Sequence, residues 1–149
     1  MTIEEYRSHM MAVATKTIPK ESKKFLVSEA LKLKRRMISY SYSNVPISDK
    51  PQTEKHKKYH KSFKLGKTYK YNEALSKRVF NATYYGKFVE YGRKVAVGYR
   101  KFDRYRNSTN VKGISKHYNV VENVQKEFDP IYYADTDAWI EKMLEEGKL

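Results

Sequence analysis

The chain of 149 residues is long enough for one domain and carries 31 basic and 17 acidic side chains, for a formal net charge of +14. Leu, Ile, Val and Phe make up about a fifth of it, so we expect a small core that tyrosine or a partner subunit completes. The lack of cysteine excludes disulfide frameworks, cysteine-based zinc sites and thiol catalysis. No run of eighteen apolar residues is present that could span a membrane, and we expect no secretory signal at the start.

The first forty residues predict two helical segments. Residues 1–18 form an N-terminal helical extension with two glutamates in its first turn. Pro19 is expected to break this helix or to restart it as a first-turn residue. The main helix is predicted over 19–40, because apolar residues recur there at spacings of four and three, namely Leu26, Ala30, Leu33, Met37 and Tyr40. The lysines and arginines on its other faces suit either an anionic partner or an ordinary solvated surface.

The middle of the chain predicts a loop and then a sheet. Residues 41–58 lack periodicity and contain two prolines, which is typical of a long loop. The sheet is expected over 59–124, starting with an alternating strand at 59–71 that a glycine at position 66 divides into two pieces. The other predicted strands are 76–82, 94–99 and 117–124. A polar, basic loop is inserted among them at 100–116.

A C-terminal helix is predicted over 132–147, after Pro130. Strands bracketed by helices indicate an α+β architecture. The sequence therefore predicts a single domain over 1–149, with a long N-terminal amphipathic helix packed on a small antiparallel β-sheet and a helix at the C-terminus.

The charge is distributed unevenly. Residues 122–149 hold eight acidic and three basic side chains, whereas residues 1–121 hold 28 basic and 9 acidic ones. This charge distribution has three interpretations. A basic body indicates a protein that binds polyanions, and a basic body with an acidic end suits head-to-tail assembly of subunits. The third interpretation is an ordinary solvated surface. For assembly, the candidate subunit-interface residues are Arg35, Arg36, Lys57, Lys58, Arg100, Lys101, Arg104, Arg106, Asp135, Asp137, Glu141 and Glu145.

No residue pattern indicates catalysis, and we expect no enzyme, no cofactor and no metal site. Glycine-rich phosphate loops are absent from the sequence. His56 and His60 lie four residues apart, but the lysines around them oppose metal binding. Basic and aromatic residues alternate over 57–71 and 98–106, as in surfaces that stack nucleotides. A basic, non-enzymatic nucleic-acid-binding protein therefore stays open as the alternative function.

The most specific local feature is the segment NATYYGKFVEYG at 81–92. Tyr84, Phe88 and Tyr91 fall on helical spacing and are expected to anchor the segment by packing. Its two glycines are expected to permit a close approach and to end the turn, and Glu90 to bond a backbone group or a basic residue. The whole signature is Tyr84, Tyr85, Gly86, Phe88, Val89, Glu90, Tyr91 and Gly92.

With an amphipathic helix at 20–40, a loop at 45–55 and a strand at 59–67 that carries Ser62, this segment resembles the neck and tail-completion (head-proximal tail-component) protein family of long-tailed bacteriophages. The glycine-containing turn usual in that family is not intact after Pro46. The resemblance implies a structural virion protein without catalysis. Such a protein forms an oligomeric ring at the head–tail junction or the head-proximal tail end, as a neck connector, tail-completion or tail-terminator protein.

The resemblance also implies the partners and the location. The ring joins or terminates the tail and surrounds the DNA channel. The expected partners are further copies of the chain, other head–tail connector and tail-tube or sheath proteins, and genomic DNA in transit, with no membrane. The protein is expected to be made in the cytoplasm of the host bacterium and to reside in the neck or tail of the virion.

Overall fold

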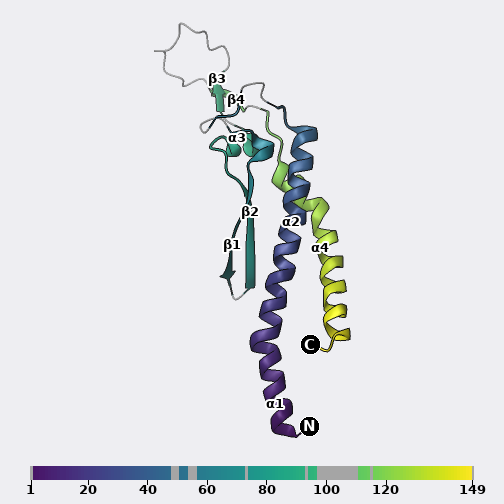
Figure 1. Cartoon of the computed structure of the whole chain (residues 1–149). Coiled ribbons are helices and arrows are strands. Elements are labelled where there is room, and N and C mark those ends of the chain that lie inside the picture. Colours follow the sequence, from purple (N-terminus) through teal and green to yellow (C-terminus); the bar gives the residue numbers. More distant parts are fainter. Residues whose placement is uncertain are drawn as a thin grey trace.

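A long helix forms the spine of the molecule in this computed structural model, which describes residues 2–47, 51–53, 57–72, 74–92, 94–96, 111–114 and 116–148. A β-hairpin lies along one side of the spine and the C-terminal helix lies along the other (Figure 1). The C-terminal helix runs antiparallel to the spine, so both termini lie toward the same end of the molecule. This arrangement confirms the predicted α+β fold, with a long N-terminal helix packed on a small antiparallel sheet.

The spine is continuous from Ile3 to Asn44. Of the two alternatives predicted for Pro19, the break is wrong, and the proline stands in the first turn where the α-helix resumes, as the other alternative has it. It consists of α1 (Ile3–Ala12), a π-helical turn η1 (Val13–Thr17) and α2 (Ile18–Asn44). A proline lacks a backbone N–H and its ring clashes with the carbonyl four residues earlier. The wider π turn stands directly before Pro19, with the N–H of Ile18 bonded to the carbonyl of Val13. The local widening admits the proline without interrupting the helix.

The hairpin consists of β1 (Phe63–Tyr71) and β2 (Ala74–Asn81), paired antiparallel. The register shifts between Leu65 and Thr68, where the sequence predicts a bend at Gly66. A Cβ on Gly66 would lie 3.3 Å from the Cβ of Arg78 across the hairpin, so the strands approach closely there. Residues 59–61, predicted as strand, form a 3-10 turn instead (η2, Tyr59–Lys61).

Two shorter elements follow the hairpin. The short helix α3 (Gly86–Tyr91) lies within the signature segment. A second two-stranded sheet pairs β3 (Lys94–Ala96) with β4 (Val111–Ile114), which lies inside the predicted loop 100–116. The predicted loop at 41–58 begins too early, because residues 41–44 form the last turn of α2. Residues 48–50 and 54–56 of that loop, and residues 97–110, lie outside the described residues.

The C-terminal helix α4 (Val120–Glu145) begins twelve residues earlier than predicted and contains Pro130. The predicted strand at 117–124 is therefore wrong. Val120, Val124 and Phe128 are buried at spacings of four, which is a helical stripe and not a strand alternation. Because this stripe packs on α2, its burial outweighs the hydrogen bond that Pro130 removes.

The main core lies where α2, the start of the hairpin and the start of α4 meet. Its buried members are Met37, Tyr59, Phe63, Val120 and Val124. Ala30 and Met37 are buried, and Leu26, Leu33 and Tyr40 are half-buried, so the predicted apolar stripe is confirmed. Farther along, Phe25 of α2 stacks on Trp139 of α4, with ring centroids 5.2 Å apart. Tyrosine and tryptophan thus supply much of the packing, as the low aliphatic content requires.

Candidate assembly surfaces

The signature segment is held in place by Asn81, at the end of β2. The Asn81 side-chain oxygen accepts hydrogen bonds from the Thr83 backbone N–H (3.0 Å) and hydroxyl (2.7 Å), which turns the chain toward α3. Its amide group donates to the carbonyl of Tyr59 at 2.7 Å. Asn81 is not among the predicted site residues, although an asparagine directly after a strand is a turn signal.

The two glycines of the segment behave as predicted. A Cβ on Gly86 would lie 3.2 Å from the Thr83 hydroxyl, so only glycine fits without displacing that group. Gly92 ends α3 with φ of 71° and ψ of 177°, a conformation available almost only to glycine. Its N–H bonds the carbonyl of Phe88 at 2.9 Å, which closes the last turn.

Glu90 connects three elements of the fold. Its Oε1 accepts a hydrogen bond of 2.5 Å from the Tyr59 hydroxyl, and its Oε2 accepts one of 3.1 Å from the backbone N–H of Val121. The second bond satisfies a free N–H in the first turn of α4, where a negative charge also suits the helix dipole. Burial raises the pKa of the Tyr59 phenol, and the hydrogen bond to Glu90 raises it further. Glu90 is therefore a structural acceptor, bonded to a backbone group as one of the two predicted alternatives has it.

The prediction that Tyr84, Phe88 and Tyr91 anchor the segment is wrong. Their side chains are 71%, 46% and 72% exposed, whereas Tyr85 and Val89 pack against the core. Both sets have helical spacing, so periodicity alone does not tell the inner face from the outer one. We call Tyr84, Phe88 and Tyr91 the α3 aromatic face. Tyr84 lies in the turn before α3, and Phe88 and Tyr91 lie on α3 itself, which Glu90 bonds to the core.

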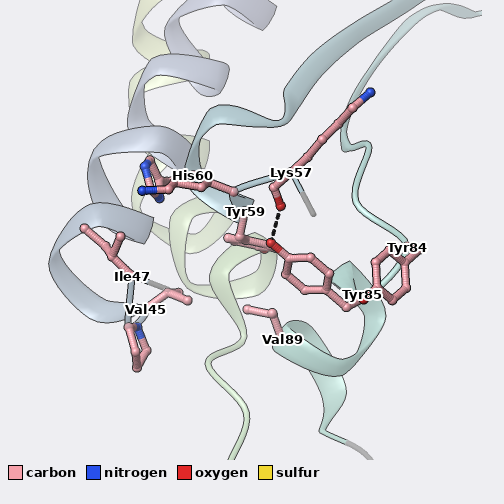
Figure 2. A pocket seen from close by; sticks show the side chains of 10 residues that line it. Val45, Ile47, Lys57, Tyr59, His60, Tyr84, Tyr85 and Val89 are labelled. Carbon is pink, nitrogen blue, oxygen red and sulfur yellow. Dashed lines mark hydrogen bonds between the residues drawn. The ribbon is translucent and has the colours of Figure 1, made fainter. Parts of the chain in front are cut away.

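A pocket of about 320 Å³ opens beside the α3 aromatic face (Figure 2). Its walls come from the end of α2, the segment before β1, and α3. The Tyr85 hydroxyl donates to the carbonyl of Lys57 across the pocket, as the dashed line in Figure 2 marks. The lining is mainly apolar and aromatic and includes two lysines and one histidine. Its residues are Val45, Pro46, Ile47, Lys57, Lys58, Tyr59, His60, Tyr84, Tyr85 and Val89.

His60 lies in this pocket with its ring against that of Tyr42, at a centroid distance of 4.1 Å. Burial lowers the pKa of His60, and the charges of Lys61 and Lys58 lower it further. No group of three or more metal-ligating side chains occurs among the residues that the structure describes.

The candidate interface residues fall into three groups. Arg35, Arg36, Lys57, Asp137, Glu141 and Glu145 are exposed, and Lys58 is half-buried at the pocket. Asp135 differs, because it accepts a hydrogen bond of 2.7 Å from Lys32 of the same chain and so joins α4 to α2. This bond lowers the pKa of Asp135 and raises that of Lys32. Four candidates lie outside the described residues: Arg100, Lys101, Arg104 and Arg106.

In the described part of the chain, no helix is long and apolar enough to cross a membrane. Comparison of this chain with protein-family models, with curated proteins and with solved structures gives no match.

Proposed function

We propose that this chain is a structural virion protein of a tailed phage that forms a homo-oligomeric ring at the head–tail junction or the head-proximal tail end. In this role it joins or terminates the tail, as a neck, connector or tail-completion protein, and surrounds the channel through which the genomic DNA passes. It acts by contact and not by catalysis. Its partners are further copies of itself and the adjoining connector, tail-tube or sheath proteins.

The observation that carries this proposal is the α3 aromatic face. It belongs to the segment that resembles the phage family. It exposes Tyr84 in the turn before α3, and Phe88 and Tyr91 on α3, a helix whose inner side is fixed to the core. Rigid, exposed aromatic side chains are what protein interfaces use, because they bury much area at little cost in conformational entropy. A neighbouring pocket with a basic rim gives an acidic partner a place to dock.

Electron microscopy of the purified protein tests the ring, and mass spectrometry of purified virions tests the location. The proposal requires closed rings of uniform size and a fixed number of copies in each virion. A protein absent from virions overturns the proposal, whatever its oligomeric state.

One observation favours the alternative, a basic nucleic-acid-binding protein without enzymatic activity. The strand β1 exposes Lys64, Lys67 and Lys70 beside Tyr69 and Tyr71, a mixture of cations and rings that suits a single-stranded nucleic acid. Tight binding of an oligonucleotide by a monomer, weakening steeply with salt, would support this function over the first.

A further inference from the structure

The outer side of α4 carries apolar side chains among acidic ones. Tyr133, Asp137, Ile140 and Leu144 follow one another at spacings of four, three and four, and Glu141 stands four residues after Asp137. All five are exposed, Tyr133 by 68% and Leu144 by 59%. We call these five residues the α4 outer face.

The α4 outer face points away from α2 of its own chain. Trp139, whose ring stacks on Phe25, lies on the side of α4 that packs on α2. Asp137 and Glu141 are each two residues from Trp139, and two residues correspond to about 200° of rotation around a helix. The exposed apolar side chains between these two acids therefore favour contact with a separate molecule.

A second exposed face, on α2, combines apolar and basic side chains. Lys20, Lys24, Val27, Leu31 and Arg35 follow one another at spacings of four, three, four and four. Val27 is half-buried and the other four are exposed, so neither the hairpin nor α4 covers this side of the helix. We call these five residues the α2 outer face.

The α2 outer face is hollowed toward its N-terminal end. A shallow depression of about 400 Å³ is lined by Lys20, Lys23, Lys24 and Val27. A lysine keeps its ammonium group in water while its methylene stem lies along apolar surface. The depression therefore has an apolar floor and a basic rim, which fits an apolar side chain that stands beside carboxylates.

Most charges on the two faces have no partner within the chain. Asp137 and Glu141 make no ion pair with a residue that the structure describes, and the same holds for Lys20, Lys23 and Arg35. The α4 outer face is acidic and the α2 outer face is basic, and each exposes apolar side chains. The two faces are therefore complementary in charge and alike in apolar character.

We propose that the α4 outer face of one copy of this chain docks on the α2 outer face of another copy, with Leu144 in the lysine-lined depression and the carboxylates of Asp137 and Glu141 beside its cations. The occupant is a second copy because α4 carries the acidic and apolar side chains that fit the depression, yet points them away from α2 of its own chain. This contact deepens the proposed function and rests on its self-assembly. Because the two faces differ, the contact is heterologous and can close into a ring.

Charge reversal in two separate full-length chains tests the contact. One variant carries Asp137→Lys with Glu141→Lys, which makes the α4 outer face basic. The other carries Lys20→Glu with Lys23→Glu, which makes the depression acidic. Alone, each variant brings like charges together and is expected to self-associate roughly tenfold more weakly than wild type in sedimentation velocity. Circular dichroism melts show whether each variant retains the fold.

Mixing the two variants is the decisive measurement. The basic α4 of the first then meets the acidic α2 of the second, and the unchanged faces of the two copies meet as in wild type. The equimolar mixture is therefore expected to regain association within about threefold of wild type. The matched controls reverse exposed charges elsewhere, Glu4→Lys with Glu127→Lys and Lys64→Glu with Lys67→Glu, and each should stay within about twofold of wild type.

Leu144→Ser tests the apolar part of the contact without changing any charge. The loss of a buried leucine side chain at the interface is expected to weaken association roughly tenfold. Ile3→Ser removes an exposed apolar side chain from α1 instead and is the control, expected to stay within about twofold of wild type.

The outcomes separate this contact from the proposed ring. Wild-type rings that persist in both charge-reversed variants and in Leu144→Ser overturn the contact and leave the ring. Association that the mixture fails to restore also overturns the contact, because the reversed charges then act on another surface. Restored association in chains that never close supports the contact and contradicts the ring.

Two further outcomes are decisive. If Lys20→Glu with Lys23→Glu abolishes binding of a DNA oligonucleotide and leaves self-association unchanged, nucleic acid occupies the α2 outer face and the contact is overturned. A wild-type chain that is monomeric at every concentration overturns both the contact and the ring.

Discussion

Tyr59 and Glu90, 31 residues apart in the sequence, are joined by a hydrogen bond of 2.5 Å in which the phenol donates to Oε1. The other oxygen of Glu90 accepts from the N–H of Val121 in the first turn of α4. One carboxylate thus links the turn before β1, the short helix α3 and the C-terminal helix. Since Glu90 and Tyr59 are both buried, this link sets the position of the α3 aromatic face relative to the core.

Removal of the Glu90 carboxylate is expected to destabilise the fold. Glu90→Ala leaves the Tyr59 hydroxyl and the Val121 N–H without their acceptor, at a cost of about 1.5–3 kcal/mol in the free energy of unfolding. Glu90→Gln keeps one acceptor oxygen and is expected to cost less. Urea denaturation measures both, with Glu122→Gln at an exposed site of α4 as the control. A loss in Glu90→Ala no larger than that of the control would contradict this role.

The folded protein is expected to become less stable as the pH is lowered, because of His60. Its pKa in the folded protein is below the ordinary value, so between these two values the unfolded chain binds more protons than the folded one. By linkage, the free energy of unfolding then decreases as the pH falls from about 7 toward 5. Urea midpoints at pH 7.5 and 5.5 test this. His60→Asn is expected to have a smaller difference between the two midpoints than His117→Asn, a change at an exposed histidine, and equal differences would refute the assignment.

Gly92 is expected not to tolerate a side chain. Its φ of 71° combined with ψ of 177° is strained for any L residue, so Gly92→Ala should cost about 1–3 kcal/mol of folding stability. Lys87→Ala, at an exposed position of the same short helix, is the control and is expected to change stability by less than about 0.5 kcal/mol. Thermal or urea unfolding of both variants measures the difference. Equal stabilities would mean that the end of α3 relaxes.

The two faces of α3 are expected to respond differently to truncation. Tyr84→Ala and Tyr91→Ala remove exposed rings, so the monomer should keep its stability within about 0.5 kcal/mol while ring assembly is lost. Val89→Ala, on the inner face, should destabilise the monomer itself by about 1 kcal/mol or more. Unfolding curves and the fraction of rings in electron micrographs provide the two readouts. Rings at wild-type yield from the tyrosine variants would exclude the α3 aromatic face as an interface.

Assembly is expected to weaken with salt if the acidic residues of α4 contact the basic body of a neighbour. The screening length falls from about 10 Å at 0.1 M salt to about 3 Å at 1 M, so exposed charge pairs between copies lose most of their attraction. Asp137→Lys with Glu141→Lys should reproduce that loss at low salt, because both acids are exposed. Light scattering across a salt series measures the oligomer. Salt-independent oligomers would show that these charges stay in solvent.

The helices and strands were predictable where local pattern and tertiary packing agree. The stripe from Leu26 to Tyr40 marks the inner face of α2, and the alternation after Phe63 marks β1. The prediction failed at residues 117–124, where β-branched valines suit a strand and also a helix with four-residue spacing. It failed again at Pro130, which lies inside α4, since a proline ends a helix only if no neighbouring contact compensates for the lost hydrogen bond.

The sequence by itself determined the α+β class, the small tyrosine-supplemented core, the main helix and the glycine-bounded segment at 81–92, because these depend on composition, periodicity and local backbone freedom. Only the tertiary structure decided which face of α3 points outward, which groups Glu90 bonds, and that Asp135 is paired with Lys32 of its own chain. Those outcomes depend on contacts between residues far apart in the sequence. Where two local patterns fit the sequence equally well, the one that buries more apolar surface in the fold is adopted.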